Sequence, residues 1–425
     1  MVSVPLNVFQ RLARQWDVVH PYNAAQVLKI AGNPDLGQLQ QAYHDTLESL
    51  GLGRVRVDGQ TFCYECLNGE LSMYGVRMVP AGASIENFIA ESLNRRFDNP
   101  SEPPFRPFVI PGEGFYYAGV VYHHWIADSV SIRTLLHEWF VRLFDPAAAT
   151  CRPLRLPDQG YRQFFRGDRS LTAAGSSLLS AARWASALRR VRRVEWRSDD
   201  MSVNFAVRRV EPGWIETLHH AAHRRGVTLN DMFLAALARV CDQYVPLKTR
   251  PRRHGLALGS IVDLRPYSPQ LADAFGLFLG FTNVICRAQE LKNPELLLRA
   301  VAVQSTRQKR QGIAQTSAMR MLAGVAAARF VDPANMAKFY HKHIPLAGGI
   351  SNVNMTRTWA MRYHPHPLMD YIRVSPTGPM MPLVMATTTL GRQFHFALTY
   401  RRTVVPPASI DSLSRSFVES LMAYL

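Results

Sequence analysis

Apolar positions along the chain alternate between a spacing typical of strands and one typical of helices. In the first half, short apolar runs predict strands at 25–30, 54–57, 62–67 and 115–123, and the helical period predicts helices at 36–47, 85–97 and 129–144. The segment 115–123 is rich in aromatic and β-branched residues, which indicates a buried strand. This first half therefore mixes strands and helices.

A second block of the same kind follows after a stretch of different composition. Strands are expected at 203–210, 256–262, 281–286, 383–389 and 393–399, and helices near 212–216, at 232–244, 294–311 and 318–330, and from 409. Thr228 and Asn230 are both candidate N-caps for the helix at 232. The run 348–353 predicts a turn followed by a strand.

The pattern predicts an α/β fold of two similar halves. We expect an N-terminal subdomain at 1–165, a basic crossover linker at 166–200 and a C-terminal subdomain at 201–425. Prolines and arginines set the linker apart from the regions on either side.

Composition narrows the class of protein. With 425 residues, 47% of them hydrophobic and 19% charged, the chain can bury a large core and is not disordered. The 49 Lys and Arg against 32 Asp and Glu give a net charge of +17, which attracts anions. Nucleic acid is not the expected partner, because no basic module with interleaved aromatics or zinc ligands is present.

Localisation follows from what the sequence lacks. Its first residues resemble no export signal, and no apolar run is long enough to span a bilayer. Five cysteines, an odd number spread over a long chain, favour a reducing cytoplasm.

Two adjacent histidines stand where an apolar strand is expected to end and a helix to begin. His123 ends the predicted strand and His124 follows it, while Asp128 directly precedes the predicted helix and Ser129 begins it. An imidazole held by a rigid strand at the edge of a channel suits a general base near neutral pH. Asp128 would orient the loop through an ion pair. Judged from these residues alone, the alternative to a general base is that the two histidines only cap the end of the strand.

The sequence His-His-x-x-x-Asp in this position resembles the HHxxxDG motif of the chloramphenicol-acetyltransferase-like superfamily. That superfamily includes the condensation domains of nonribosomal peptide synthesis, plant BAHD acyltransferases, polyketide-associated acyltransferases and bacterial wax ester synthases. Further segments are similar to family elements in order and spacing. They are the opening strand and helix at 27–47, the T-x-N-D helix at 228–237, the D-x-R strand end at 262–266, the glycine-containing segment at 276–280 and the S-N-V turn at 350–353.

The resemblance implies two chloramphenicol-acetyltransferase-like subdomains, each a mixed sheet with flanking helices, with an active-site tunnel at their interface. His124 would take the proton from an acceptor hydroxyl or amine that attacks a thioester carbonyl. Asp128 would pair with an arginine, for which Arg265 is the candidate. The other implied positions are His123, Ser129 and Asp263 as structural or motif residues, and Trp125, Ser351 and Asn352 at the tunnel or as oxyanion donors.

The resemblance also implies the ligands. The co-substrate would be an acyl-CoA or a phosphopantetheinyl thioester on an acidic acyl carrier protein, and the acceptor a small alcohol or amine. No metal and no permanently bound cofactor is expected, and the protein would act as a monomer.

The sequence departs from the family pattern in three respects. Ser129 replaces the glycine of the motif, and a serine there narrows the passage beside the histidine. The DFGWG element of the plant enzymes is absent, which argues against a BAHD member. No carrier-protein or adenylation region accompanies the chain, so we expect a stand-alone, bacterial-type enzyme.

Two metal-like patterns carry less weight. Cys63 and Cys66 have the spacing of half a zinc site, but no second pair completes it. His219 and His223 share a helix face without the glutamate of a metalloprotease motif, so a solvated basic helix is favoured.

The basic stretch 183–197 leaves three interpretations open. It is a solvated helix face, a binding surface for the acidic acyl donor, or a peripheral contact with an anionic membrane.

Acyl transfer is the function expected. The alternatives are a free-standing condensation enzyme that joins carrier-bound intermediates in natural-product biosynthesis, and a catalytically silent, condensation-like binding module.

Overall fold

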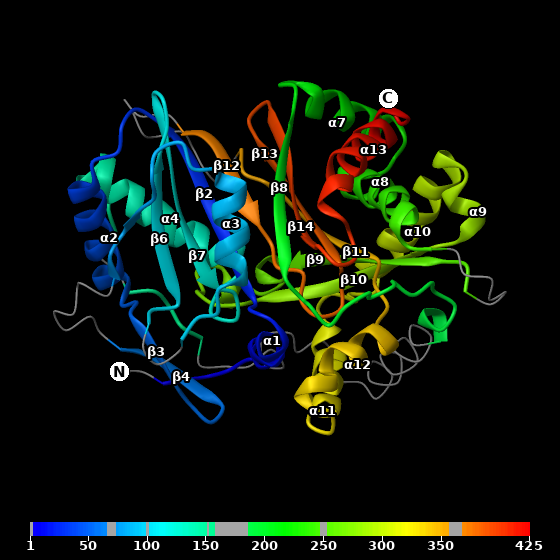
Figure 1. The fold of residues 1–425 in the computed structure, drawn as a ribbon, viewed down its shortest axis with the longest axis horizontal. Helices are drawn as coiled ribbons and strands as arrows, with labels where there is room; N and C mark the ends of the chain where they lie inside the picture. The colour runs from blue at the N-terminus through cyan, green and yellow to red at the C-terminus, as the bar shows by residue number, and fades with distance from the viewer. Residues whose placement is uncertain are drawn as a thin grey trace.

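The computed structural model describes residues 3–65, 74–98, 102–150, 153–157, 186–246, 253–356 and 368–425. Two mixed sheets stand side by side, each backed by helices on its outer face (Figure 1). Within this part of the chain, no helix is long and apolar enough to cross a membrane. The α/β fold of two subdomains, each a mixed sheet with flanking helices, is confirmed.

The first sheet has the strand order β12-β2-β7-β6-β5. Its strands are β2 (Asn23–Ala31), β5 (Arg77–Met78), β6 (Phe105–Pro111), β7 (Phe115–His123) and β12 (Leu368–Val374). Helices α2 (Leu36–Leu50) and α4 (Ser129–Phe144) pack against each other, and α3 (Ile85–Asn94) lies between β2 and the second sheet. A left-handed Gly51 ends α2, because glycine adopts a φ of 68° without strain.

The second sheet has the order β10-β9-β11-β13-β14-β8. Its strands are β8 (Val203–Val210), β9 (Leu256–Asp263), β10 (Leu279–Cys286), β11 (Gly348–Asn354), β13 (Leu383–Leu390) and β14 (Gln393–Arg401). The helices of this half are α7 (Trp214–Arg224), α8 (Leu229–Tyr244), α9 (Ala288–Leu291), α10 (Pro294–Arg310) and α13 (Ile410–Met422). Thr228, not Asn230, caps α8, in a capping box with Asp231.

Strand β12 connects the two halves. It follows β11 of the second sheet in the chain, yet it pairs antiparallel with β2 at the edge of the first sheet. A buried cluster that includes Ile372 and Val374 of β12, residues of α3 and residues of β8 fills the space between the sheets. Part of the predicted C-terminal subdomain thus completes the N-terminal sheet, while the predicted boundaries at 165 and 200 remain predictions.

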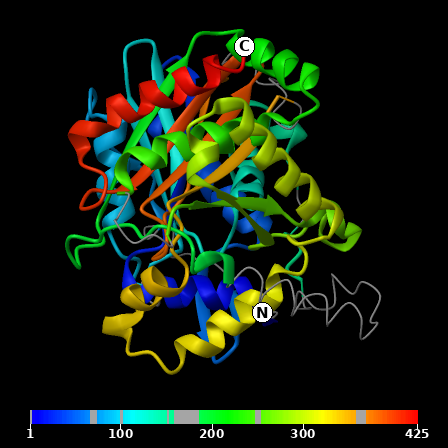
Figure 2. The same ribbon diagram turned by 90° about the vertical axis from the view of Figure 1, so that its right-hand side faces the viewer.

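A third group of elements closes the lower end of the molecule. It consists of α1 (Val8–Val19), α11 (Ser317–Ala328), α12 (Met336–His343) and a small sheet of β1 (Val4–Pro5), β3 (Arg54–Asp58) and β4 (Thr61–Glu65). Helix α1 packs against α11, and both views place these helices together below the second sheet (Figures 1 and 2). Five 3₁₀ turns complete the described elements: η2 (Pro146–Ala148), η3 (Arg265–Tyr267), η4 (Pro269–Leu271), η5 (Pro333–Asn335) and η6 (Pro407–Ser409).

Several sequence-based expectations need correction. The expected S-N-V turn at 350–353 is wrong, because these residues lie inside β11 and pair in parallel with β13. The sequence analysis also missed α1, α12, β6 and β12. Cys66, residues 158–165 of the predicted N-terminal subdomain, residues 166–185 of the predicted linker and residues 183–185 of the basic stretch lie outside the described residues. In the remainder of that stretch, Arg192 is buried and paired with Asp242, while Arg189 and Arg190 are exposed.

Candidate active site

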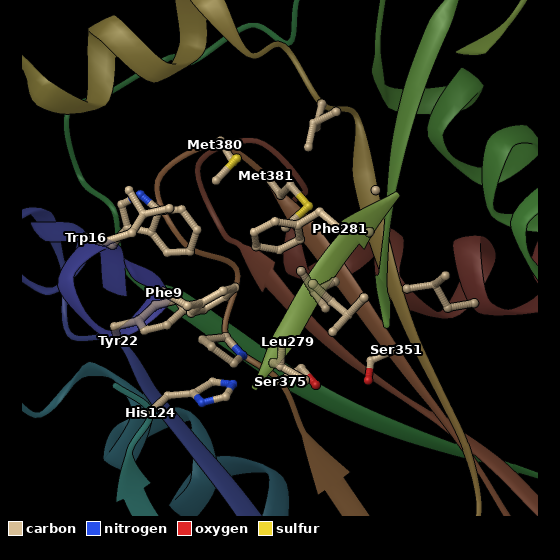
Figure 3. A pocket seen from close by; sticks show the side chains of 18 of the residues that line it. Phe9, Trp16, Tyr22, His124, Leu279, Phe281, Ser351, Ser375, Met380 and Met381 are labelled. Atoms are coloured by element: carbon tan, nitrogen blue, oxygen red, sulfur yellow. The ribbon is translucent and has the colours of Figure 1, made fainter. Parts of the chain in front are cut away.

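A deep pocket opens between the two halves, lined by residues from both sheets and from α1, α11 and α12. The space within it is about 1290 Å³ when the open solvent at its mouth is included. Most of the wall is apolar and aromatic, including Phe9, Trp16, Phe281, Met380 and Met381 (Figure 3). Polar residues also line it, among them His124, Ser351 and Ser375 (Figure 3) and Asn283, Ser317 and Arg320.

His124 projects into this pocket from the end of β7 (Figure 3). Its ring stacks on Tyr22 with centroids 5.3 Å apart, and its backbone N–H donates to the Tyr22 carbonyl at 3.0 Å. Nδ1 lies 2.9 Å from the carbonyl oxygen of Ala127. Because a carbonyl only accepts, Nδ1 carries the hydrogen of the neutral ring and Nε2 is left with the free lone pair.

Burial keeps this imidazole neutral. Only 8% of His124 is exposed. Desolvation is the largest influence and lowers the pKa of His124 below 6.5, although the hydrogen bond to Ala127 and the charge of Asp128 act in the opposite direction. A neutral ring with a free Nε2 is the form that accepts a proton from a substrate.

His123 faces away from the pocket. Its Nδ1 accepts a hydrogen bond of 3.0 Å from Trp125 Nε1, its Nε2 lies 3.0 Å from an Asp17 carboxylate oxygen, and its ring stacks on Phe97. Trp125 is fully buried and packs edge-on against Phe62. Trp125 does not line this pocket, because its side chain contacts the core behind the loop.

Asp128 is buried and performs two tasks. Its Oδ1 accepts from the backbone N–H groups of Val130 and Ser131, each at 3.0 Å, and so caps α4. Its Oδ2 accepts from Arg265 Nη1 at 2.7 Å and from the Phe278 N–H at 2.9 Å. Burial by itself would raise the pKa of Asp128, but the Arg265 guanidinium and these hydrogen bonds hold it below its ordinary value.

Arg265 joins the loop of the first half to the second half. Its Nη1 also contacts Asp263 Oδ1 at 3.2 Å, and its Nη2 donates to Ser131 Oγ at 2.9 Å. Nη2 and Nε share the carbonyl of Ala274. Residues 124–128, which connect β7 to α4, form the histidine loop. The pair between Asp128 and Arg265 holds this loop against the second half, on the side of the loop that faces away from the pocket.

The remaining predicted positions are Ser129, Ser351 and Asn352, and only the first two line the pocket. Ser351 lines the pocket, as does Ser129 at the start of α4. Asn352, the next residue along β11, does not line it, and its Oδ1 accepts from Thr387 Oγ1 at 2.9 Å. Ser351 and Asn352 differ in this way because successive strand residues point to opposite faces.

The pocket also contains residues that the sequence analysis missed. Arg373 on β12 and Gln26 on β2 both line it, and Arg373 contacts Ser129 and Ser351. A sequence signal was available for Arg373, because a single arginine between the apolar residues Ile372 and Val374 is unusual in a buried strand. Gln26 is likewise a single polar residue between apolar neighbours in a buried strand, but a neutral amide there is less unusual than a charged arginine.

Two mixed sheets with a histidine-bearing pocket between them define a two-subdomain fold of the chloramphenicol-acetyltransferase type. The chain belongs to the condensation-domain family, whose model matches residues 10–314. A search of curated protein sequences finds no match.

Solved structures share this fold at low sequence identity. The trichothecene 15-O-acetyltransferase from Fusarium sporotrichioides superposes with a TM-score of 0.76 at 10% identity, over 100% of this chain and 96% of that chain. The cyclization-docking bidomain of a nonribosomal peptide synthetase from Sorangium cellulosum gives 0.67 at 13% identity, over 100% and 84% of the two chains. The condensation domain of the monacolin K polyketide synthase gives 0.64 at 12% identity, over 100% and 96%.

Proposed function

We propose that this protein transfers an acyl group from a thioester of coenzyme A or of an acyl carrier protein to a hydroxyl or amine acceptor, with His124 as general base. One observation carries the proposal: in a condensation-domain fold, His124 is held neutral with Nε2 free at a large pocket between the halves. The acetyltransferase named among the similar structures is consistent with this chemistry.

The proposed reaction needs one proton carrier. Nε2 takes the proton from the acceptor as its oxygen or nitrogen attacks the thioester carbonyl, and a tetrahedral oxyanion forms. Collapse of this intermediate breaks the carbon–sulfur bond, and the departing thiolate takes the proton back from the imidazolium. The hydrogen bond from Nδ1 to Ala127 keeps the ring oriented through both transfers.

The test is an assay of thiol release. Acyl-CoAs of graded chain length, and the same acyl groups on a holo carrier protein, are offered with a panel of alcohols and amines. Acceptor-dependent thiol release, with the acylated product detected by mass spectrometry, is expected for at least one combination. Release only from the carrier-bound donor would favour the condensation-enzyme alternative, and no acceptor-dependent release from either donor would favour a silent binding module.

The pH dependence follows from the lowered pKa of His124. A base must be unprotonated to act, so activity is lost as the pH falls through its pKa. We expect the acid limb of kcat/KM to have an apparent pKa below 6.5. A pH–rate profile with a saturating acceptor measures it. An acid limb above 6.5 would mean that a group other than a buried His124 of lowered pKa controls the rate.

The basic surface predicts a salt effect on the acyl donor. Arg189, Arg190, Arg193 and Arg197 are exposed around the crossover, and both proposed donors are acidic. We expect the donor KM to rise with salt while kcat stays constant, and Arg189→Gln with Arg190→Gln to flatten that rise. The acceptor KM is the internal control. A donor KM that does not change with salt would indicate that these arginines form a solvated surface and do not bind the donor.

A further inference from the structure

Arg373 is a buried cation in the wall of the pocket. Only 2% of it is exposed, and it lines the pocket together with Gln26, Ser129 and Ser351. Its Nε donates to Ser129 Oγ at 3.1 Å and its Nη2 to Ser351 Oγ at 2.6 Å. Its Nη1 donates to the carbonyls of Ser351 at 3.3 Å and Thr387 at 3.2 Å. All of these acceptors are neutral.

The charge of Arg373 is not balanced within the part of the chain that the structure describes. Two other buried arginines, Arg265 and Arg192, pair with Asp128 and Asp242, whereas Arg373 has no carboxylate among its partners. Burial lowers the pKa of Arg373 to about 10, and the nearby Arg133 adds to the positive potential. A guanidinium in an apolar setting is stabilised by an anion that comes to it.

The hydrogen bonds around Arg373 leave donors for such an anion. Ser129 Oγ accepts from Arg373 and, at 3.1 Å, from Gln26 Nε2, so its lone pairs are used and its own hydroxyl hydrogen remains to donate. Ser351 Oγ likewise accepts from Arg373. A guanidinium has five N–H donors, and the bonds above use four. Among the residues that the structure describes, the two hydroxyls and the last Nη2 hydrogen therefore remain available to bind a ligand.

We propose that Arg373, Ser129 and Ser351 bind a carboxylate group of the substrate that enters this pocket. A planar carboxylate with two acceptor oxygens matches a guanidinium flanked by hydroxyl donors, and the apolar wall suits the hydrocarbon part of the same molecule. Ser351 then serves substrate binding and not the reaction's oxyanion. Ser129, which stands where the family motif has glycine, becomes a specificity-determining residue, because glycine would remove both an acceptor for Arg373 and a donor for the carboxylate.

The inference rests on the proposed function only in calling the ligand a substrate, so binding is tested without turnover. Hexanoate and hexanamide are compared as probes by isothermal titration calorimetry on the full chain. Wild-type protein is expected to bind hexanoate about tenfold or more tightly than hexanamide. Ser129→Gly should weaken hexanoate binding several-fold, and Arg373→Met should abolish the preference for the carboxylate. The control is Arg392→Met, which removes an exposed guanidinium from the surface and should bind hexanoate like wild type.

Equal affinity of the wild-type protein for the two probes would overturn the proposal. So would an equal loss of hexanoate affinity in Arg373→Met and Arg392→Met, because the effect would then come from net charge. If Arg373→Met does not fold, Ser129→Gly decides the matter: unchanged hexanoate binding in this variant contradicts the site.

Two further measurements show whether the carboxylate belongs to the acyl donor or to the acceptor. They also test the carboxylate site separately from the proposed acyl transfer. If it belongs to the acyl donor, adipoyl-CoA should bind more tightly than hexanoyl-CoA. If it belongs to the acceptor, hexanoate should compete with the acceptor and leave the two acyl-CoAs equal. Hexanoate selectivity without thiol release from any donor would refute acyl transfer and keep the site, whereas thiol release without that selectivity would refute the site alone.

Discussion

The His124→Ala variant is expected to lose acyl transfer by about 10²- to 10⁴-fold in kcat/KM, the contribution of a positioned general base. The loss should fall on kcat, because the substitution leaves the apolar wall of the pocket unchanged. Exogenous imidazole should restore part of the activity, since the substitution leaves a ring-sized space beside Tyr22. Single-turnover kinetics with and without imidazole measure both effects.

A matched control is available on β14. His395 is also buried and is paired with Asp370 at 3.1 Å, but it does not line the pocket. His395→Ala should lower stability and retain activity per folded molecule. Turnover like that of the wild type in His124→Ala would exclude His124 as the base, and equal losses in the two variants would point to a general effect of removing a buried imidazole.

Asp128→Asn is expected to destabilise the fold by about 3–5 kcal/mol, because it leaves the buried Arg265 without its closest carboxylate. The asparagine oxygen can still cap α4, so the loss comes mainly from the ion pair between the halves. Chemical denaturation measures the free energy of unfolding, and the activity of the folded fraction shows whether the histidine loop has moved.

Two further variants isolate this ion pair. Asp263 also contacts Arg265, but its side chain is 35% exposed, so Asp263→Asn should cost no more than about 1 kcal/mol. Adding Arg265→Met to Asp128→Asn should recover part of the lost stability, because it removes the unpaired charge. If Asp128→Asn melts and turns over like the wild type, the pair does not hold the loop.

The expected outcomes have a common structural cause. The loop that carries His124 extends from the first half, while the groups that secure it from behind, Arg265 and the Phe278 N–H, belong to the second half. Strand β12 brings Arg373 from the second half into the first sheet. The pocket is therefore formed by both halves together, and neither half by itself contains all of its residues.

The sequence by itself determined the local elements of this protein and the position of its central histidine. Apolar period and capping residues are local properties, so β7, β8 and α4 lie within the ranges expected from the pattern, and Thr228 caps α8. The two histidines before Asp128 were equally visible in the sequence. Which of them faces the pocket came only from the family resemblance, because a strand end does not show where the substrate lies.

Only the tertiary structure decided which distant residues meet at the pocket. Arg373 lies 244 positions from Ser129, whose hydroxyl it contacts, and the two are brought together by the antiparallel pairing of β12 with β2. The pleat of β11 turned Ser351 toward the pocket and Asn352 away from it, and the core packing of Trp125 kept that side chain out. Such choices depend on sheet register and on packing between the halves, which short-range sequence patterns do not encode.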